Sequence, residues 1–256
     1  NILVIGDSCK DIYKYGICDR LDQEAPVLIF KEEKEVTYEG MSLNVANNVA
    51  SFGINCDLIT NSKSIKKIRF VDIRSNQLVM RVDENDGIPN IRKLKEIKLN
   101  NYDAVIVSDY NKGFLTEGQM NYIASNSKLS FLQTSKVLEK WCENFSYIKI
   151  NNYEFQNTSQ FTPKKYLEQL NLIITKGEKG AVFKNKNFQI KKPVTIRSLA
   201  GAGDTFLAGL VSSYVQNKNI EKSINFAQSQ SKKAVSELGI SVVGEKKNNK
   251  PRIIKI

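Results

Sequence analysis

The sequence predicts an α/β fold with a central, mostly parallel sheet flanked by helices. Apolar runs that end in polar residues recur at 2–7, 102–109 and 147–151, which is typical of buried parallel strands. Segments with helical patterns, such as 45–52 and 224–239, alternate with these runs. A chain of 256 residues suits one large domain better than two independent ones.

The first strand predicted is Ile2 to Ile5, and it ends in Gly6-Asp7. Asp7 and Asp11 then lie where ligands bind in open α/β sheets, beyond the carboxyl end of a strand. Turn formation and helix capping are the alternative roles for both carboxylates. Short strands are also expected at 27–30 and 35–38.

A helix is predicted at 45–52, opened by Glu39-Gly-Met-Ser-Leu-Asn44 and ended by Gly53. Alternating residues at 68–73 and 77–82, on either side of Arg74-Ser-Asn76, predict a hairpin.

The second half of the chain continues the α/β pattern. Strands are expected at 102–109, 130–133, 147–150 and 172–175. A further hairpin is expected within 183–190, followed by a final helical region at 224–239.

The stretch Leu199-Ala-Gly-Ala-Gly-Asp-Thr-Phe-Leu-Ala-Gly209 follows the β-rich residues 194–196. Gly201, Ala202 and Gly203 have almost no side chain, so their N–H groups can approach an anion closely. A helix that begins at Asp204 or Thr205 adds the positive end of its dipole. The result is an anion hole beside a carboxylate, as phosphoryl transfer requires. An ordinary tight turn capped by Asp204 is the alternative.

The composition excludes several classes of protein. With no histidine in the chain, Ser-His-Asp and Cys-His catalysis are impossible. The four dispersed cysteines favour reduced thiols in a cytoplasmic protein: they are Cys9, Cys18, Cys56 and Cys142. No apolar run reaches the length of a membrane span.

The net charge of +11 is spread along the chain, so we expect a solvated basic surface and regard nucleic-acid binding as the lesser alternative.

Ala200-Gly-Ala-Gly-Asp-Thr205 resembles the C-terminal signature of the PfkB/ribokinase-type carbohydrate kinases. Gly6-Asp7 with Asp11, then Glu24-Ala-Pro-Val27, then Gly40 with Asn44-Val-Ala46, are similar to the kinases of the bacterial ADP-heptose pathway. These enzymes phosphorylate D-glycero-D-manno-heptose 7-phosphate at O1. The resemblance covers nearly the whole chain. It implies a single ribokinase-like domain over residues 1–256, with a small β lid drawn from about 27–38 and 67–82.

The resemblance implies a role for each matching residue. Asp204 would be the general base, and the backbone of Gly201, Ala202 and Gly203 would stabilise the transferring phosphoryl group. The sugar phosphate would be held by residues of the N-terminal half: Asp7, Asp11, Gly40, Asn44, Arg69, Asp109 and Lys112, with Arg81 as a further candidate. A solvated lid face is the alternative for both arginines.

Two later motifs resemble the nucleotide site of the same family. Asn151-Asn-Tyr-Glu154 matches N-x-x-E, whose glutamate would organise hydrated Mg²⁺. Thr175, Gly177 and Gly180 match T-x-G-x-x-G, and the helical region 224–239 would line the adenine pocket. ATP and Mg²⁺ are therefore the expected cofactors, and a homodimer through the lid is the expected assembly.

Four features depart from the family pattern. Met41 replaces a small residue, Thr134 and Ser198 each replace an acid, and a βαβ stretch expected near 61–66 is missing. These departures leave two alternatives to a heptose kinase. One is a binding protein that has lost catalysis, and the other is a PfkB kinase for another sugar.

Overall fold

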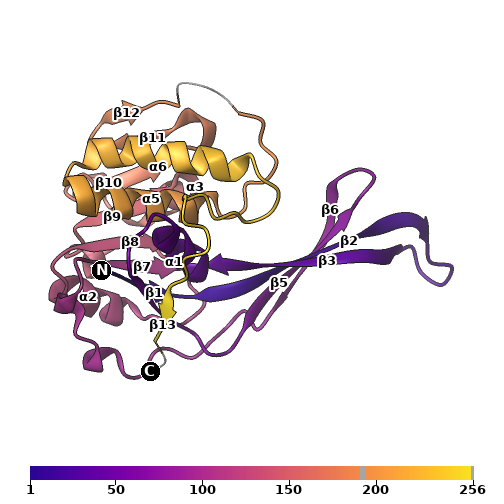
Figure 1. Ribbon diagram of the computed structural model, residues 1–256, viewed down its shortest axis with the longest axis horizontal. Coiled ribbons are helices and arrows are strands. Elements are labelled where there is room, and N and C mark those ends of the chain that lie inside the picture. The colour runs from indigo at the N-terminus through magenta and orange to yellow at the C-terminus, as the bar shows by residue number, and fades with distance from the viewer. Residues whose placement is uncertain (191–193, 255–256) are drawn as a thin grey trace.

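The computed structural model describes residues 1–190 and 194–254, which form a main body and an arm that projects from it (Figure 1). Among these residues the body contains a nine-stranded sheet in the order β12-β11-β10-β9-β8-β7-β1-β4-β13. Only the pairs β10–β11 and β11–β12 are antiparallel, which confirms the predicted α/β class. The strands are β1 (Ile2–Gly6), β4 (Cys56–Thr60), β7 (Ala104–Asp109), β8 (Ser130–Thr134), β9 (Tyr147–Asn151), β10 (Leu172–Thr175), β11 (Ala181–Phe183), β12 (Lys186–Phe188) and β13 (Arg252–Ile253).

Helices cover both faces of this sheet, because alternate strand residues point to opposite sides. Ile2 and Val4 of β1 pack in one core with α1, α5 and α6. Leu3 and Ile5 pack in the other core with α2. The helices are α1 (Ser42–Ser51), α2 (Glu117–Asn126), α3 (Asn152–Phe161), α4 (Lys164–Leu167), α5 (Ala202–Asn217) and α6 (Ile220–Val235), with short 3₁₀ turns at Leu94–Glu96, Leu99–Asn101, Lys140–Cys142 and Gly177–Lys179.

The projecting arm is a four-stranded sheet in the order β3-β2-β5-β6, here called the lid. Its strands are β2 (Ser8–Leu21), β3 (Leu28–Met41), β5 (Ile65–Asp72) and β6 (Gln77–Glu84). The sequence analysis did not assign β2 to a strand and divided β3 into two. In β3, the charged residues 31–35 are all exposed, so no alternation marks the strand.

The lid leaves the body at the edge where parallel strands end. Asp7 alone separates β1 from β2, and only Asn61–Ser64 separate β4 from β5. The chain therefore passes directly from the main sheet to the lid, without the βαβ stretch that the resemblance led us to expect near 61–66. Residues 194–196, whose β-branched side chains favoured a strand, are irregular; Arg197 instead donates its backbone N–H to Val235 O at 2.8 Å.

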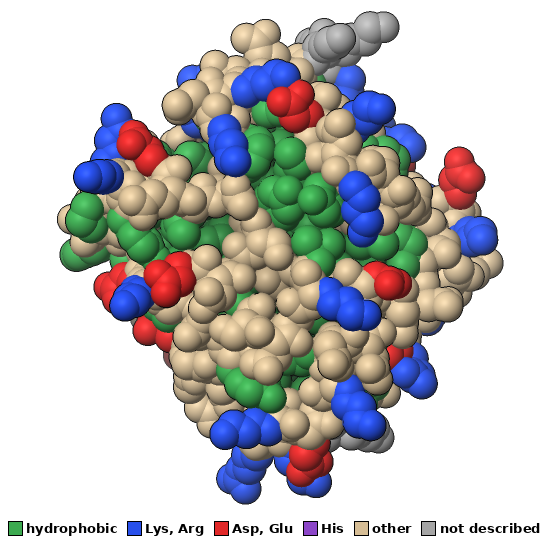
Figure 2. Space-filling view, turned by 90° about the vertical axis from the view of Figure 1, so that its left-hand side faces the viewer, with side chains coloured by type: hydrophobic (Ala, Val, Ile, Leu, Met, Phe, Trp, Pro, Cys, Tyr) green, Lys and Arg blue, Asp and Glu red, His purple; other side chains and the backbone are tan. Residues whose placement is uncertain are grey.

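Positive charge is scattered over the face seen in Figure 2, which is turned away from the lid. Lysine and arginine side chains alternate there with acidic and uncharged ones and form no single basic patch. In residues 1–190 and 194–254, every helix is too short or too polar to cross a membrane.

Candidate active site

Helix α5 begins within the glycine motif. Gly201 is its N-cap with a φ of 76°, a left-handed conformation that glycine adopts without strain. The first helical residue is Ala202, two residues earlier than the earlier of the two expected starts. Within the described chain, the N–H groups of Gly203 and Asp204 have no backbone acceptor. These two groups, at the positive end of the helix dipole, are suited to hold an anion.

Asp204 is buried beside these N–H groups, with 3% of its surface exposed. Its Oδ2 accepts a hydrogen bond from Asn44 Nδ2 at 3.1 Å, and its Oδ1 accepts from the Tyr110 hydroxyl and from Gln133 Nε2 at 3.4 Å. Burial raises the pKa of Asp204, whereas these donors and the charge of Lys149 oppose the rise. The carboxylate is thus surrounded by donors in a site that excludes water.

Lys149 is a second buried charge in this site, and the sequence analysis missed it. It lies on β9 with 4% of its surface exposed, and its Nζ donates to Gln133 Oε1 at 2.8 Å. Burial lowers the pKa of Lys149, while the negative charges of Glu154 and Asp204 counteract that effect. The signal in the sequence was a lysine inside the otherwise apolar run Tyr147–Ile150, two residues before the N-x-x-E motif.

Several residues predicted to bind the sugar lie together near Asp204. Asn44, in the first turn of α1, contacts the carboxylate directly. On the lid, a Cβ added to Gly40 would lie 2.6 Å from Asp11 Oδ2, so any larger residue there would displace the Asp11 carboxylate. Asp11 forms an ion pair with Arg69. The structure therefore brings these residues together, but it pairs Arg69 with a carboxylate of the lid itself.

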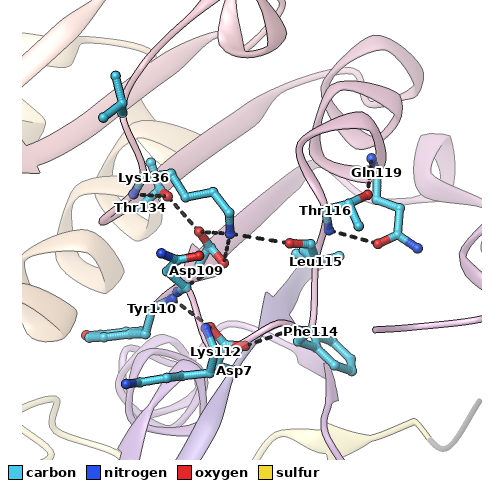
Figure 3. A network of polar contacts seen from close by, with 12 residues as sticks. Asp7, Asp109, Tyr110, Lys112, Phe114, Leu115, Thr116, Gln119, Thr134 and Lys136 are labelled. Carbon is cyan, nitrogen blue, oxygen red and sulfur yellow. Dashed lines mark hydrogen bonds and ion pairs between the residues drawn. The ribbon is translucent and has the colours of Figure 1, made fainter. Parts of the chain in front are cut away.

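Asp7 lies beneath the loop that follows β7 (Figure 3). Its carboxylate accepts hydrogen bonds from the backbone N–H groups of Tyr110 at 2.7 Å, Phe114 at 3.4 Å and Lys112 at 3.5 Å. Burial raises the pKa of Asp7, and these three bonds act against that rise. In the geometry described, Asp7 fixes the loop that delivers Tyr110 to Asp204, and its predicted contact with the sugar stays a prediction.

Asp109 and Lys112, the other two residues predicted here as substrate ligands, also have partners within the protein, and Figure 3 shows those of Asp109. Asp109 is buried, accepts from Thr134 Oγ1 at 2.6 Å, and pairs with Lys136 Nζ at 2.9 Å. Lys112 extends to Asp86, with Nζ and Oδ1 2.5 Å apart. Their roles as substrate ligands stay predictions.

A cavity of about 490 Å³ opens beside the first turn of α5. The predicted nucleotide residues Thr175, Gly177 and Gly180 line it, and Val235 and other residues of α6 form another wall. Its lining includes Gly203, so the cavity reaches the free N–H groups described above. An apolar hollow that leads to an anion site has the shape that a nucleotide needs.

Asn151 and Glu154 lie at the start of α3 and do not line that cavity. They form a capping box, in which Asn151 Oδ1 accepts from Glu154 N at 2.8 Å and Glu154 Oε2 accepts from Asn151 N at 2.7 Å. One carboxylate oxygen of Glu154 is therefore engaged by the backbone and the other is available. A single free carboxylate oxygen fits a hydrated Mg²⁺, which keeps most of its ligands as water.

Residues 78–246 match the family described as pfkB family carbohydrate kinase. The chain belongs to the PfkB family of carbohydrate kinases. The match covers more than half of the chain and includes β7 through α6, and with them Asp204 and the cavity.

Curated relatives of this PfkB domain include the bifunctional protein HldE of several bacteria. The HldE of Nitratiruptor sp. is 29% identical over 93% of this chain and 62% of its own length. Those of Helicobacter acinonychis and Campylobacter jejuni are 28% and 27% identical over the same share of this chain. The chain thus spans just over three fifths of the length of these relatives.

Solved structures confirm the ribokinase-like fold. Ribokinase from Thermotoga maritima superposes with a TM-score of 0.75 at 17% identity, covering 96% of this chain and 97% of that one. Ribokinase from Arabidopsis thaliana, complexed with ribose and ATP, has a TM-score of 0.72 at 13% identity and covers 98% and 95%.

The three substitutions in the PfkB pattern have distinct surroundings. Met41 is buried and has a φ of 63° at the N-cap of α1, a backbone conformation that favours a small residue. Thr134 donates to Asp109. Ser198 accepts from Ala200 N at 3.2 Å. All three side chains are accommodated within the domain.

Proposed function

We propose that this domain transfers the γ-phosphoryl group of ATP to a sugar phosphate, with Asp204 as the general base. The observation that carries the proposal is the position of Asp204, buried among donors and next to the free N–H groups of α5. The preferred substrate is D-glycero-D-manno-heptose 7-phosphate, phosphorylated at O1, because the curated relatives are HldE proteins.

In this mechanism Asp204 takes the proton of the acceptor hydroxyl, and the N–H groups of Gly203 and Asp204 hold the transferring phosphoryl group. Lys149 adds positive charge beneath them. The base of ATP would lie in the cavity against α6. Glu154 would hold hydrated Mg²⁺, which supplies charge neutralisation at the phosphates.

The lid supports a phosphorylated sugar rather than a neutral one. Strand alternation places Lys67, Arg69 and Arg81 on the face of the lid that carries Asp11. Lys67 contacts the body, with its Nζ 5.4 Å from the centre of the Tyr110 ring. Arg69 is paired with Asp11, and Arg81 with Asp83. Lys67, for which the described residues show no ion pair, is therefore the cation of this face best placed for a phosphate at the far end of the sugar.

The opposite face of the lid supports the expected homodimer. It exposes a row of apolar side chains on β6: Leu78 at 56%, Met80 at 51% and Val82 at 37%. Ile68 and Phe70 lie opposite Val82 and Met80 on β5 and extend this row. Exposed apolar sheet faces of this kind usually mark interaction surfaces, and we propose a second copy of this chain as the partner.

The alternatives make different demands. A binding protein without catalysis has no use for the buried Asp204. A general polyanion-binding protein would need a basic patch, and the face seen in Figure 2 carries none. The four free cysteines support the proposed cytoplasmic location, because thiols stay reduced in that compartment.

The test is coupled ADP release with Mg²⁺ and ATP against a panel of sugars. The panel contains D-glycero-D-manno-heptose 7-phosphate, sedoheptulose 7-phosphate, fructose phosphates and free hexoses. We expect turnover on heptose 7-phosphate to exceed that on free hexoses by at least about 100-fold. Equal turnover on free hexoses would reject the sugar-phosphate assignment, and saturable binding without any ADP release would favour the non-catalytic alternative.

A further inference from the structure

Tyr110 joins the loop after β7 to the carboxylate of Asp204. Its hydroxyl contacts Asp204 Oδ1 and also lies 3.2 Å from Gln133 Nε2. Asp7 fixes the backbone on which this side chain stands, through the N–H of Tyr110. The tyrosine is therefore held in place from its backbone to its hydroxyl.

The direction of each hydrogen bond in this group follows from Lys149. An ammonium can only donate, so Gln133 must present Oε1 to Lys149 and Nε2 to Tyr110. The Tyr110 oxygen then accepts from Gln133, and its own proton points to Asp204. The chain of donors runs from Lys149 through Gln133 and Tyr110 to the carboxylate.

The two oxygens of Asp204 have different surroundings. Oδ1 accepts from Tyr110 and Gln133, whereas Oδ2 accepts, among the residues that the structure describes, only from Asn44 of α1. A bond to Oδ1 fixes the rotation of the carboxylate and leaves Oδ2 on the side of Asn44 for an incoming hydroxyl.

We propose that Tyr110 is a positioning residue for Asp204, which it keeps ionised and oriented by donating a hydrogen bond to Oδ1. This inference rests on the proposed function of Asp204 as a base. It is supported by electrostatics, because the Tyr110 bond is the largest of the effects that oppose the burial-induced rise in the pKa of Asp204. Burial and the charge of Asp204 also hold the pKa of Tyr110 well above its usual value, so it remains a donor.

Other charged or titratable groups near Asp204 remain the same when Tyr110 is changed to phenylalanine. Lys149 approaches from β9, and Cys9 approaches from β2 of the lid. Lys67, Arg69 and Asp83 of the lid act on Cys9. Glu154 of α3 acts on both Tyr110 and Lys149. Burial raises the pKa of Cys9 to about 11, so the thiol stays neutral below pH 9. A change in the titration of Asp204 would then report the lost hydroxyl.

The experiment compares wild type, Tyr110→Phe and the control Tyr122→Phe in kcat and KM from pH 5 to 9. We expect Tyr110→Phe to move the acid limb of the kcat profile upward by about one pH unit. Loss of orientation should also lower kcat at neutral pH at least about ten-fold, with KM for the sugar phosphate changed less than about three-fold. A profile that is lowered without moving, or is unchanged, overturns the proposal.

A second readout does not depend on turnover. In protein labelled with ¹³C at aspartate carboxyl carbons, Asp204 is assigned by its absence in Asp204→Asn and titrated by NMR. Its pKa should be higher in Tyr110→Phe than in wild type, and equal values would overturn the proposal. If no sugar supports turnover yet this shift is seen, the proposed function has failed while the hydrogen bond stands.

Discussion

The Nζ atom of Lys149 lies 3.0 Å from the position that a Cβ on Gly203 would occupy. The ammonium is therefore directly beneath the first turn of α5, where the N–H groups of Gly203 and Asp204 are free. A charge and a helix dipole act on the same point, so this turn combines two independent sources of positive potential. Alanine at residue 203 would crowd the lysine.

Replacing Lys149 with methionine should lower kcat by about 100- to 1,000-fold, the effect typical of losing one charge-stabilising group. KM for ATP should change less, because the ammonium lies beneath the anion site and outside the cavity lining. Steady-state kinetics at saturating sugar phosphate measure this, with the exposed Lys140→Met as the control. A kcat within two-fold of wild type would remove Lys149 from the anion site.

Asp204→Asn should make the protein more stable at neutral pH. Burial raises the pKa of Asp204 in the folded state, so its ionisation opposes folding. This penalty grows as the pH rises above 3.8, the pKa of the unfolded state, and is complete once the pH exceeds the pKa of the folded state. We expect Tm to rise by about 2–4 °C at pH 7.5, equivalent to about 1 kcal/mol in a chain of this size. The gain should fade as the pH falls toward 4. Glu33→Gln, on the exposed part of β3, should show neither change.

Lys67→Met should weaken binding of a phosphorylated sugar, because Lys67 is on the inner face of the lid. KM for the sugar phosphate should rise about ten-fold or more, the usual effect of losing a charge-assisted hydrogen bond, while KM for ATP stays constant. Lys66→Met is the matched control, since Lys66 is the preceding residue on β5 and pairs with Glu84. Equal effects in the two variants would contradict an inward phosphate site.

Met80→Lys should dissociate the proposed dimer, because it places a charge in the middle of the apolar row on β6. Light scattering coupled to size-exclusion chromatography should give the mass of two chains for wild type and of one for the variant. Phe161→Lys makes the same change at an exposed residue outside the lid. A monomeric wild type at micromolar concentration would reject the dimer.

The anion site could be predicted from sequence because its parts are contiguous, from Gly201 to Asp204. Its surroundings could not be predicted, since Tyr110 and Gln133 precede Asp204 by 94 and 71 residues. The parallel register of β7, β8 and β9 brings Tyr110 and Gln133 together, and the packing of α5 against the sheet places Asp204 beside them.

The contacts within the lid could not be predicted from the sequence either. Arg69 was recognised as a candidate cation, yet its partner depends on the pairing of β2 with β5, which places Arg69 beside Tyr13 and close to Asp11. Residues 11–18 of β2 are buried or half-buried, yet polar and apolar side chains do not alternate along them, so β2 was not recognised from the sequence.

The central claim is that Asp204 takes the proton of the acceptor hydroxyl. The most direct test is the rate of ADP release by Asp204→Asn on the best sugar phosphate, with nucleotide binding measured in parallel. We predict that kcat falls by about 100- to 10,000-fold, as expected for the loss of a general base. The affinity for ATP should stay within about three-fold of the wild-type value. Turnover close to that of wild type in this variant would contradict the account.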